Sequence, residues 1–306
     1  MFRSMALAQF TLFLFTFVSL HSLGADKDEL KLTPMSINTY QDEDDPLFVP
    51  TLSVTLPPRL YFSRKDEKGK YCIYFAKFNK KANKWNSPET IGAYVESEGD
   101  DRSCFISEEG KFPQTIIYAT KKDKKNNNFD LFRSFRDQPA KDLEDRAFNP
   151  GKPLISLDTD EDEMFPWLTK DQMTIYFSRK TKEGWKLMTA KRVKGSGPEG
   201  NFDPPAFVPD IPTNFHHATL SPLGNLMFLE GPLENGKLGI FFTNKTSSGW
   251  TTPLPVSNLN SETGKIGTKS PSLSRDGLKL YFASDRAGGQ GGLDIYNVAV
   301  QELKLK

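Results

Sequence analysis

The sequence contains 306 residues, with 40 lysines and arginines against 39 aspartates and glutamates, so its formal net charge is +1. A balanced charge argues against nucleic acid as a partner, because phosphate binding requires an excess of basic residues. The 21 prolines and 22 glycines are typical of many short strands and turns, and no segment shows sustained helical periodicity. These features indicate one large all-β domain.

The N-terminal segment has a different character from the rest of the chain. Arg3 precedes an uncharged apolar run over 10–20, and small residues at 22–24 form a cleavage site. The run is too short to span a bilayer comfortably, which disfavours an uncleaved anchor. We interpret 1–24 as a signal peptide and expect a single mature domain, 25–306, with no membrane span and a periplasmic or secreted location. Its removal leaves a net charge of zero.

The stretch 270–298 reads as three strands joined by two turns. Asp276-Gly277 is a tight-turn signal, and 278–283 alternates with an aromatic-rich β bias. A glycine-rich hairpin over 287–292 then leads into a strand over 293–298. Such a small sheet exposes apolar faces and is not stable alone, so we expect copies of it elsewhere in the chain.

Related segments recur at intervals of roughly 50 to 60 residues, each with a serine or threonine, a turn and an apolar triplet. They are Ser53 with Leu60-Tyr61-Phe62, Ser107 with Ile117-Tyr118-Ala119, Thr169 with Ile175-Tyr176-Phe177, Ser221 with Leu226-Met227-Phe228, and Ser274 with Leu280-Tyr281-Phe282. Repeats of this size are typical of propeller blades, in which each four-stranded sheet buries its faces against its neighbours.

The two ends of the chain are predicted to meet in one blade. The segment 30–40 is similar to 153–159 and 255–261, which end other repeats, whereas the last repeat stops at Lys306 without such a segment. We therefore predict an all-β fold, a five-bladed β-propeller of four-stranded antiparallel blades, in which an N-terminal strand completes the C-terminal blade.

The repeat pattern also carries a family resemblance. The segment 271–296, with Pro271, Asp276-Gly277, the triplet at 280–282 and Asp294-Ile295-Tyr296, resembles the TolB-type (WD40-like) propeller repeat. This resemblance implies an exported propeller of the bacterial cell envelope. The chain has no room for the α/β domain that precedes the propeller in TolB, so the resemblance does not extend to a Tol-Pal role.

Residues just before the inner strands are expected to meet at the mouth of the central channel. The candidate ligand-binding residues there are Asp44, Asp45, Asp101, Arg102, Asp162, Glu163, His216, His217 and Lys269. Acidic clusters around one axis repel one another unless calcium, or Arg102 and Lys269 reaching inward, neutralises them. Alternatively, the acids only solvate turns. Adjacent histidines in a strand point to opposite faces, so one of the pair should line the channel.

Two cysteines, Cys72 and Cys104, remain after the signal peptide. In an exported protein they could form a disulfide or stay as two buried thiols, and the sequence does not separate these alternatives. No histidine lies near either one in the sequence, so we expect no catalytic thiol.

The chain lacks the local motifs of serine hydrolases, zinc proteases and nucleotide-binding loops. We therefore expect a non-catalytic binding or scaffold propeller of the envelope, with a protein, peptide or glycan at the channel mouth and no catalytic residues. The alternative is a secreted carbohydrate-active enzyme, a glycosidase or lyase. Such an enzyme can draw two carboxylates from different blades and leave no local motif.

Overall fold

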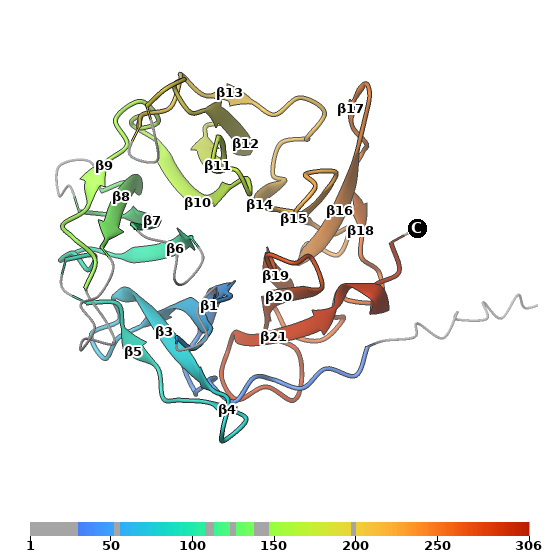
Figure 1. Ribbon diagram of the computed structural model, residues 1–306. Coiled ribbons are helices and arrows are strands. Elements are labelled where there is room, and N and C mark those ends of the chain that lie inside the picture. Colours follow the sequence, from blue (N-terminus) through green and yellow to red (C-terminus); the bar gives the residue numbers. More distant parts are fainter. Residues whose placement is uncertain are drawn as a thin grey trace, which may run out of the picture.

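The computed structural model describes residues 30–51, 56–92, 94–107, 113–122, 127–137, 147–196 and 200–305. In these ranges the chain forms five antiparallel sheets around one central axis, and the only helical element is a 3-10 turn, Val300–Glu302 (Figure 1). The predicted five-bladed propeller is confirmed. The signal peptide, 1–24, and the repeat anchor Ser53 lie outside the described residues. No helix in the described ranges is long and apolar enough to cross a membrane.

Each blade is built from consecutive strands, with the first strand nearest the axis (Figure 1). Blade one contains β1 (Glu43–Val49), β2 (Arg59–Lys65), β3 (Tyr71–Asn79), β4 (Lys84–Trp85) and β5 (Glu89–Thr90). Blade two contains β6 (Asp101–Ile106), β7 (Gln114–Thr120), β8 (Asp130–Arg136) and β9 (Lys152–Pro153). Blade three contains β10 (Asp162–Leu168), β11 (Thr174–Thr181), β12 (Gly184–Lys191) and β13 (Ala206–Phe207).

Blade four contains β14 (His216–Leu220), β15 (Leu226–Pro232), β16 (Leu238–Thr246), β17 (Gly249–Trp250) and β18 (Leu254–Pro255). Blade five contains β19 (Thr268–Leu273), β20 (Lys279–Ser284) and β21 (Asp294–Ala299). The core strands are almost wholly buried because their apolar side chains pack between adjacent blades, and the outermost strands are short and exposed. Short outer strands limit the free edge that each sheet presents to solvent.

The N-terminal segment closes the ring by lying along β21 (Figure 1). The Met35 N–H donates to the Ile295 carbonyl at 2.9 Å, and the Glu43 N–H donates to the Leu293 carbonyl at 2.8 Å. A side chain on Gly291 would collide with the Gln41 carbonyl, so the glycine-rich hairpin is needed for this close approach. The predicted closure of the C-terminal blade is therefore confirmed.

All five inner strands share one irregularity. Their pairing with the second strand shifts register at the same place, and there one residue has a positive φ. These residues are Asp45 (51°), Ser103 (39°), Phe165 (57°), His217 (49°) and Ser270 (54°). A bulge bends a strand and redirects its side chains, so each blade presents equivalent residues at the same point near the axis.

The strand pairing also corrects the repeat alignment. Tyr61 pairs with Leu47 in blade one, and the equivalent residues are Ile117 in blade two and Phe228 in blade four. The triplets chosen from the sequence were therefore one residue late in blade two and one residue early in blade four. A shift of one residue exchanges the two faces of a strand, so this error hides which side chains reach the channel.

The two cysteines are free thiols, so the disulfide alternative is not realised. Burial raises the pKa of both Cys72 and Cys104, which keeps the reactive thiolate form scarce.

Candidate functional site

Below its mouth, the central channel is filled by side chains. Pro46, Leu47, Pro166 and Trp167 are among the residues around a remaining cavity of about 20 Å³, which can hold about one water molecule. Any larger ligand on the axis must therefore bind above this level. There the bulged positions and their neighbours form the mouth cluster, which we define as Asp44, Asp45, Arg102, His216, His217, Glu230, Lys269 and Ser270.

Asp44 is the best-satisfied acid in the mouth cluster. Its carboxylate accepts hydrogen bonds from Arg102 at 2.7 Å, from the Ser270 hydroxyl at 2.6 Å and from the Asp45 N–H at 2.8 Å, and it pairs with the Lys269 ammonium. Burial alone would raise the pKa of Asp44, but the charges of Lys269 and Arg102 hold it well below its usual range. Asp44 is therefore ionised at any ordinary pH.

Asp45 has the opposite behaviour although it is the next residue. Its carboxyl lies 3.2 Å from Arg102 and accepts a longer bond, 3.3 Å, from the Ser270 hydroxyl. Burial, followed by the negative charge of Asp44, raises the pKa of Asp45. Two neighbouring carboxyl groups are thus driven toward different protonation states, an arrangement found where an acid and a base must work at the same pH.

The two histidines are neutral aromatic groups in this site. The His217 ring stacks on Phe165, with centroids 4.1 Å apart, and the His216 ring stacks on Trp185 at 5.1 Å. Burial lowers the pKa of both, that of His217 to about 3. Their contacts with nearby carboxylates are therefore not ion pairs at neutral pH.

His217 contacts two carboxyl groups that come from different blades. Its Nδ1 atom is 4.0 Å from an oxygen of Asp45 and 3.8 Å from an oxygen of Glu230. These two oxygens are therefore no more than about 8 Å apart, a bound that includes the roughly 5 to 5.5 Å separation of retaining glycosidases and the lower part of the roughly 6.5 to 9.5 Å range of inverting ones. The Ser270 N–H holds Glu230 in place by donating to its Oε2 atom at 3.0 Å, the same oxygen that faces His217.

Glu230 was missed in the sequence because of the one-residue alignment error in blade four. It pairs with His216 in the place where the other blades have a small residue. Those residues are Ser63, Ala119, Ser178 and Ala283. The sequence signal for Glu230 is thus a glutamate in a position otherwise reserved for serine or alanine, visible only in the correct register.

Polar groups of both signs reach the mouth, but cations are more accessible there. The side chains of Arg102 and Lys269 are 18% and 12% exposed, whereas those of Asp44 and Asp45 are 2% and 1% exposed. A ligand that approaches along the axis therefore meets Arg102 and Lys269 before it meets the carboxyl groups.

Asp101, Asp162 and Glu163 do not join the mouth cluster. Asp101 accepts the Ser97 N–H at 2.7 Å within the segment that leads into β6, and Asp162 accepts the Phe129 N–H at 2.8 Å, which joins blade three to blade two. Asp101 and Glu163 immediately precede the channel-facing residues of β6 and β10, and adjacent residues in a strand point to opposite faces. In blade three the residue equivalent to Asp44 is Met164, which pairs with Ser178 as Asp44 pairs with Ser63.

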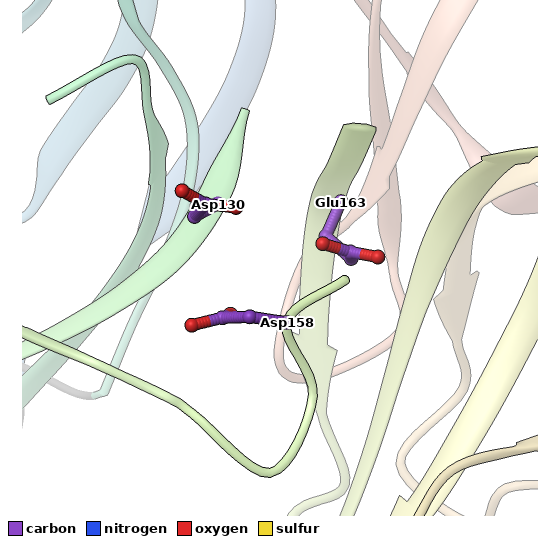
Figure 2. A group of neighbouring side chains, drawn as sticks. All are labelled: Asp130, Asp158 and Glu163. Carbon is purple, nitrogen blue, oxygen red and sulfur yellow. The ribbon is translucent and has the colours of Figure 1, made fainter. Parts of the chain in front are cut away.

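A second acidic group lies at the junction of blades two and three (Figure 2). Asp130 on β8, Glu163 on β10 and Asp158 on the intervening loop have ligand oxygens within 4.8 Å of one another. Glu163 pairs with Arg179 at 2.7 Å. Burial, and then the charges of Asp130 and Glu163, raise the pKa of Asp158 to about 7. At this spacing carboxyl groups could share either a cation or a proton.

No family model matches the sequence, and no curated protein does so either. Solved structures, in contrast, share the fold over most of the chain. An α-L-arabinofuranosidase from Podospora anserina in complex with cellotriose gives a TM-score of 0.57 at 10% identity, covering 89% of this chain and 97% of that one.

Two further neighbours have the same TM-score. The catalytic domain of a Coprinopsis cinerea GH62 α-L-arabinofuranosidase gives 0.57 at 10% identity, covering 91% of this chain and 99% of its own. A GH43_1 enzyme from Xanthomonas citri complexed with xylotriose gives 0.57 at 12% identity, covering 88% and 89%. At this identity the likeness establishes a shared propeller fold.

These neighbours correct two interpretations of the sequence. The TolB-type assignment is wrong, because the three propellers described above, which match over nearly the whole chain, are glycoside hydrolases. The expectation of a non-catalytic envelope scaffold, without enzymatic activity, is contradicted by the same finding. The repeat signature describes how a blade is built, and several propeller classes can share it because the turn and packing requirements are the same.

Proposed function

We propose that this protein is a carbohydrate-active enzyme that hydrolyses a glycosidic bond at the mouth cluster. The observation that carries the proposal is the pair of adjacent carboxyl groups with opposite pKa shifts, in which Asp44 is held ionised and the pKa of Asp45 is raised. A carboxyl group whose pKa is raised by its surroundings is the usual source of the general acid in glycoside hydrolysis. The glycoside hydrolases that share the fold support the same reaction class.

In the proposed mechanism Asp45 is the general acid. It donates its proton to the glycosidic oxygen as the bond from that oxygen to the anomeric carbon breaks. Glu230, whose carboxyl group lies near the same His217 nitrogen, removes a proton from the attacking water, whose oxygen forms the new bond to the anomeric carbon. Asp44 acts as a positioning residue, because its fixed negative charge raises the pKa of Asp45.

Arg102 and Lys269 have two roles in this proposal. They neutralise Asp44, and as the more exposed members of the cluster they can donate hydrogen bonds to sugar hydroxyls. Because these two cations already supply the charge that calcium would supply, the reaction at the mouth does not require calcium, which the sequence left as one possible way to neutralise the acids. The substrate class we propose is a short oligosaccharide, as in the neighbours bound to cellotriose and xylotriose.

The proposed location is periplasmic or secreted. The signal-peptide pattern over 1–24 supports it, and a mature domain of 25–306 contains every residue of the mouth cluster.

The test is hydrolysis of a panel of xylo-, arabinoxylo- and cello-oligosaccharides by the purified protein. We expect release of sugars, and we expect Asp45→Asn to lower kcat by about 10²- to 10⁴-fold, the usual contribution of a general acid. Asp203→Asn, at an exposed position away from the mouth, is the matched control and should retain full activity. Activity should fall as the pH rises through the raised pKa of Asp45.

Either of two results would refute the assignment. The first is an absence of hydrolysis across the panel by the folded wild-type protein. The second is hydrolysis by Asp45→Asn at the wild-type rate, which would place the chemistry elsewhere in the molecule. A thermal unfolding curve of each variant separates loss of catalysis from loss of fold.

A further inference from the structure

Two junctions between blades are closed by an asparagine that binds both polar groups of one residue. The Asn38 side chain donates to the Ile295 carbonyl at 3.0 Å and accepts the Ile295 N–H at 2.9 Å. Asn260 makes the same pair of bonds with Ile240, at 3.0 Å and 2.7 Å. An amide suits this role because it offers one donor and one acceptor side by side.

Asp158 occupies the corresponding place at the junction of blades two and three. It is followed by Thr159, whose N–H and hydroxyl donate to Glu163 at 3.2 Å and 2.6 Å. Thr39, which follows Asn38, donates to Glu43 in the same way at 3.0 Å and 2.6 Å. The two segments thus have the same local structure, with an aspartate in one where the other has an asparagine.

The strand partner of Asp158 is also equivalent. The Leu131 N–H on β8 hydrogen-bonds the Asp158 carboxyl, as Ile295 on β21 does with Asn38. The Leu131 carbonyl accepts the Leu154 N–H at 2.8 Å, just as the Ile295 carbonyl accepts a backbone N–H at 2.9 Å. At the closing junction the Asn38 amide is a second donor to the Ile295 carbonyl. At the junction of blades two and three an ionised Asp158 has no hydrogen to donate, so the Leu131 carbonyl lacks this second donor.

One carboxyl oxygen of Asp158 is left without a hydrogen bond in the part of the chain that the structure describes. Oδ1 is buried and has no hydrogen-bond partner among the described residues. Two carboxyl groups face this side chain, Asp130 from β8 and Glu163 from β10 (Figure 2). Arg179 from β11 is the cation that acts on it, so two carboxyl groups oppose a single cation. A negative charge on Asp158 would therefore face like charges and a carbonyl oxygen.

We propose that Asp158 is protonated in the folded protein and donates this proton to the Leu131 carbonyl, which makes the junction of blades two and three a pH-sensitive contact. Protonation turns the carboxylate into a carboxylic acid with one donor and one acceptor, the pattern of the asparagine amide. When the proton leaves, the donor is lost and the repulsion from Asp130 and Glu163 is restored.

The direction of the pH effect follows from the raised pKa. In the unfolded chain an aspartate titrates near 3.9, whereas in the folded protein Asp158 titrates at about 7. Between these values the folded state binds the extra proton, so its stability is greatest below about pH 4 and decreases as the pH rises to about 7. Asp158 is only partly buried, and solvent screening makes the decrease smaller than the full shift implies.

The experiment compares thermal unfolding of the full-length protein with that of Asp158→Asn from pH 4.5 to pH 8.5. The variant carries a permanent donor, so we expect its Tm to exceed that of the wild type by about 2 to 4 °C at pH 8.5 and to equal it at pH 4.5. The reciprocal change, Asn38→Asp, removes the donor to the Ile295 carbonyl and adds an acid to a junction that already contains Glu43 and Asp294, so it should create a second pH-dependent loss there.

Two outcomes would overturn the proposal. One is a difference in Tm between wild type and Asp158→Asn that stays constant over the pH range, because the substitution would then act by something other than titration. The other is stabilisation of the wild type, but not of Asp158→Asn, by added calcium at pH 8.5. That result would mean that the three acids hold a cation instead of a proton.

Discussion

The mouth cluster and the junction of blades two and three each bring buried acids together, yet the pKa values of one acid from each, Asp44 and Asp158, shift in opposite directions. At the mouth, Lys269 and Arg102 both bind Asp44, so this carboxyl group keeps its charge with a strongly lowered pKa. At the junction, Arg179 binds Glu163 directly, and the pKa of Asp158 rises to about 7.

The difference shows that burial does not by itself determine the charge of an acid. Burial acts to raise the pKa in both places, and the number of cations within bonding distance decides the outcome. The same comparison explains Asp45. It shares Arg102 with Asp44 but also feels the charge of Asp44, so its pKa rises although it lies in the cation-rich region.

The largest effect on stability is expected when the mouth loses a cation. Lys269→Met leaves Asp44 buried with only one charged partner, and breaking a buried pair from one side costs about 3 to 5 kcal/mol. The free energy of unfolding at pH 7, measured with urea, should fall by this amount. Because Asp44 would then titrate at a higher pH, the acid loss of stability should also begin at a higher pH.

Lys170→Met, at an exposed position, is the control and should change the free energy of unfolding by less than about 0.5 kcal/mol. If the two variants proved equally stable, Lys269 would not hold Asp44 in its charged form. The contrast between the two acidic regions would then lose its physical basis.

A smaller effect is expected from removing the cation at the junction. Arg179→Met leaves Glu163 with its two bonds from Thr159, and Glu163 can take up a proton, so we expect a loss of about 2 to 3 kcal/mol. Arg179 also lowers the pKa of Asp158, so the pH dependence of unfolding should extend to higher pH in this variant. Measurement of unfolding at several pH values, with Lys182→Met as an exposed control, checks both expectations.

The sequence predicted the fold because its information is repeated. Five segments with the same turn and triplet need only be approximately aligned to indicate five blades, so the one-residue errors in blades two and four did no harm at that level. Closure was predicted for the same reason, since 30–40 is similar to segments that end other blades. Fold class is thus a property of the whole set of repeats and tolerates local mistakes.

The site was less predictable because it depends on single positions. Asp44, Arg102 and Lys269 were found among the residues before the inner strands, but Glu163 was grouped with them although it points into a junction. Glu230 was missed because it lies on a second strand whose register was wrong by one residue. Strand side chains alternate, so an error of one residue exchanges the channel for the interior of a sheet.

The pairing of two long charged side chains with Asp44 was also outside the reach of sequence reasoning. Arg102 and Lys269 lie in blades two and five, and the separation along the chain gives no indication that they converge on one carboxylate. The sequence left two ways to neutralise the acids, bound calcium or these two side chains. Only the three-dimensional arrangement shows that the two side chains contact Asp44.

The smallest effect, and the most direct contrast between the two regions, is expected from Ser270→Ala. The hydroxyl donates to Asp44 at 2.6 Å, and its loss should cost about 1.5 kcal/mol, as for a hydrogen bond to a charged group. Asp44 stays ionised in the variant because Lys269 and Arg102 remain, so the loss from this bond should persist from pH 5 to pH 8.5, and the longer bond from Ser270 to Asp45 adds only a minor change. The effect of Asp158→Asn, in contrast, should grow over the same range. Urea unfolding of both variants at several pH values tests the contrast, and a Ser270→Ala loss that disappears at pH 5 would show that Asp44 is not held in its charged form.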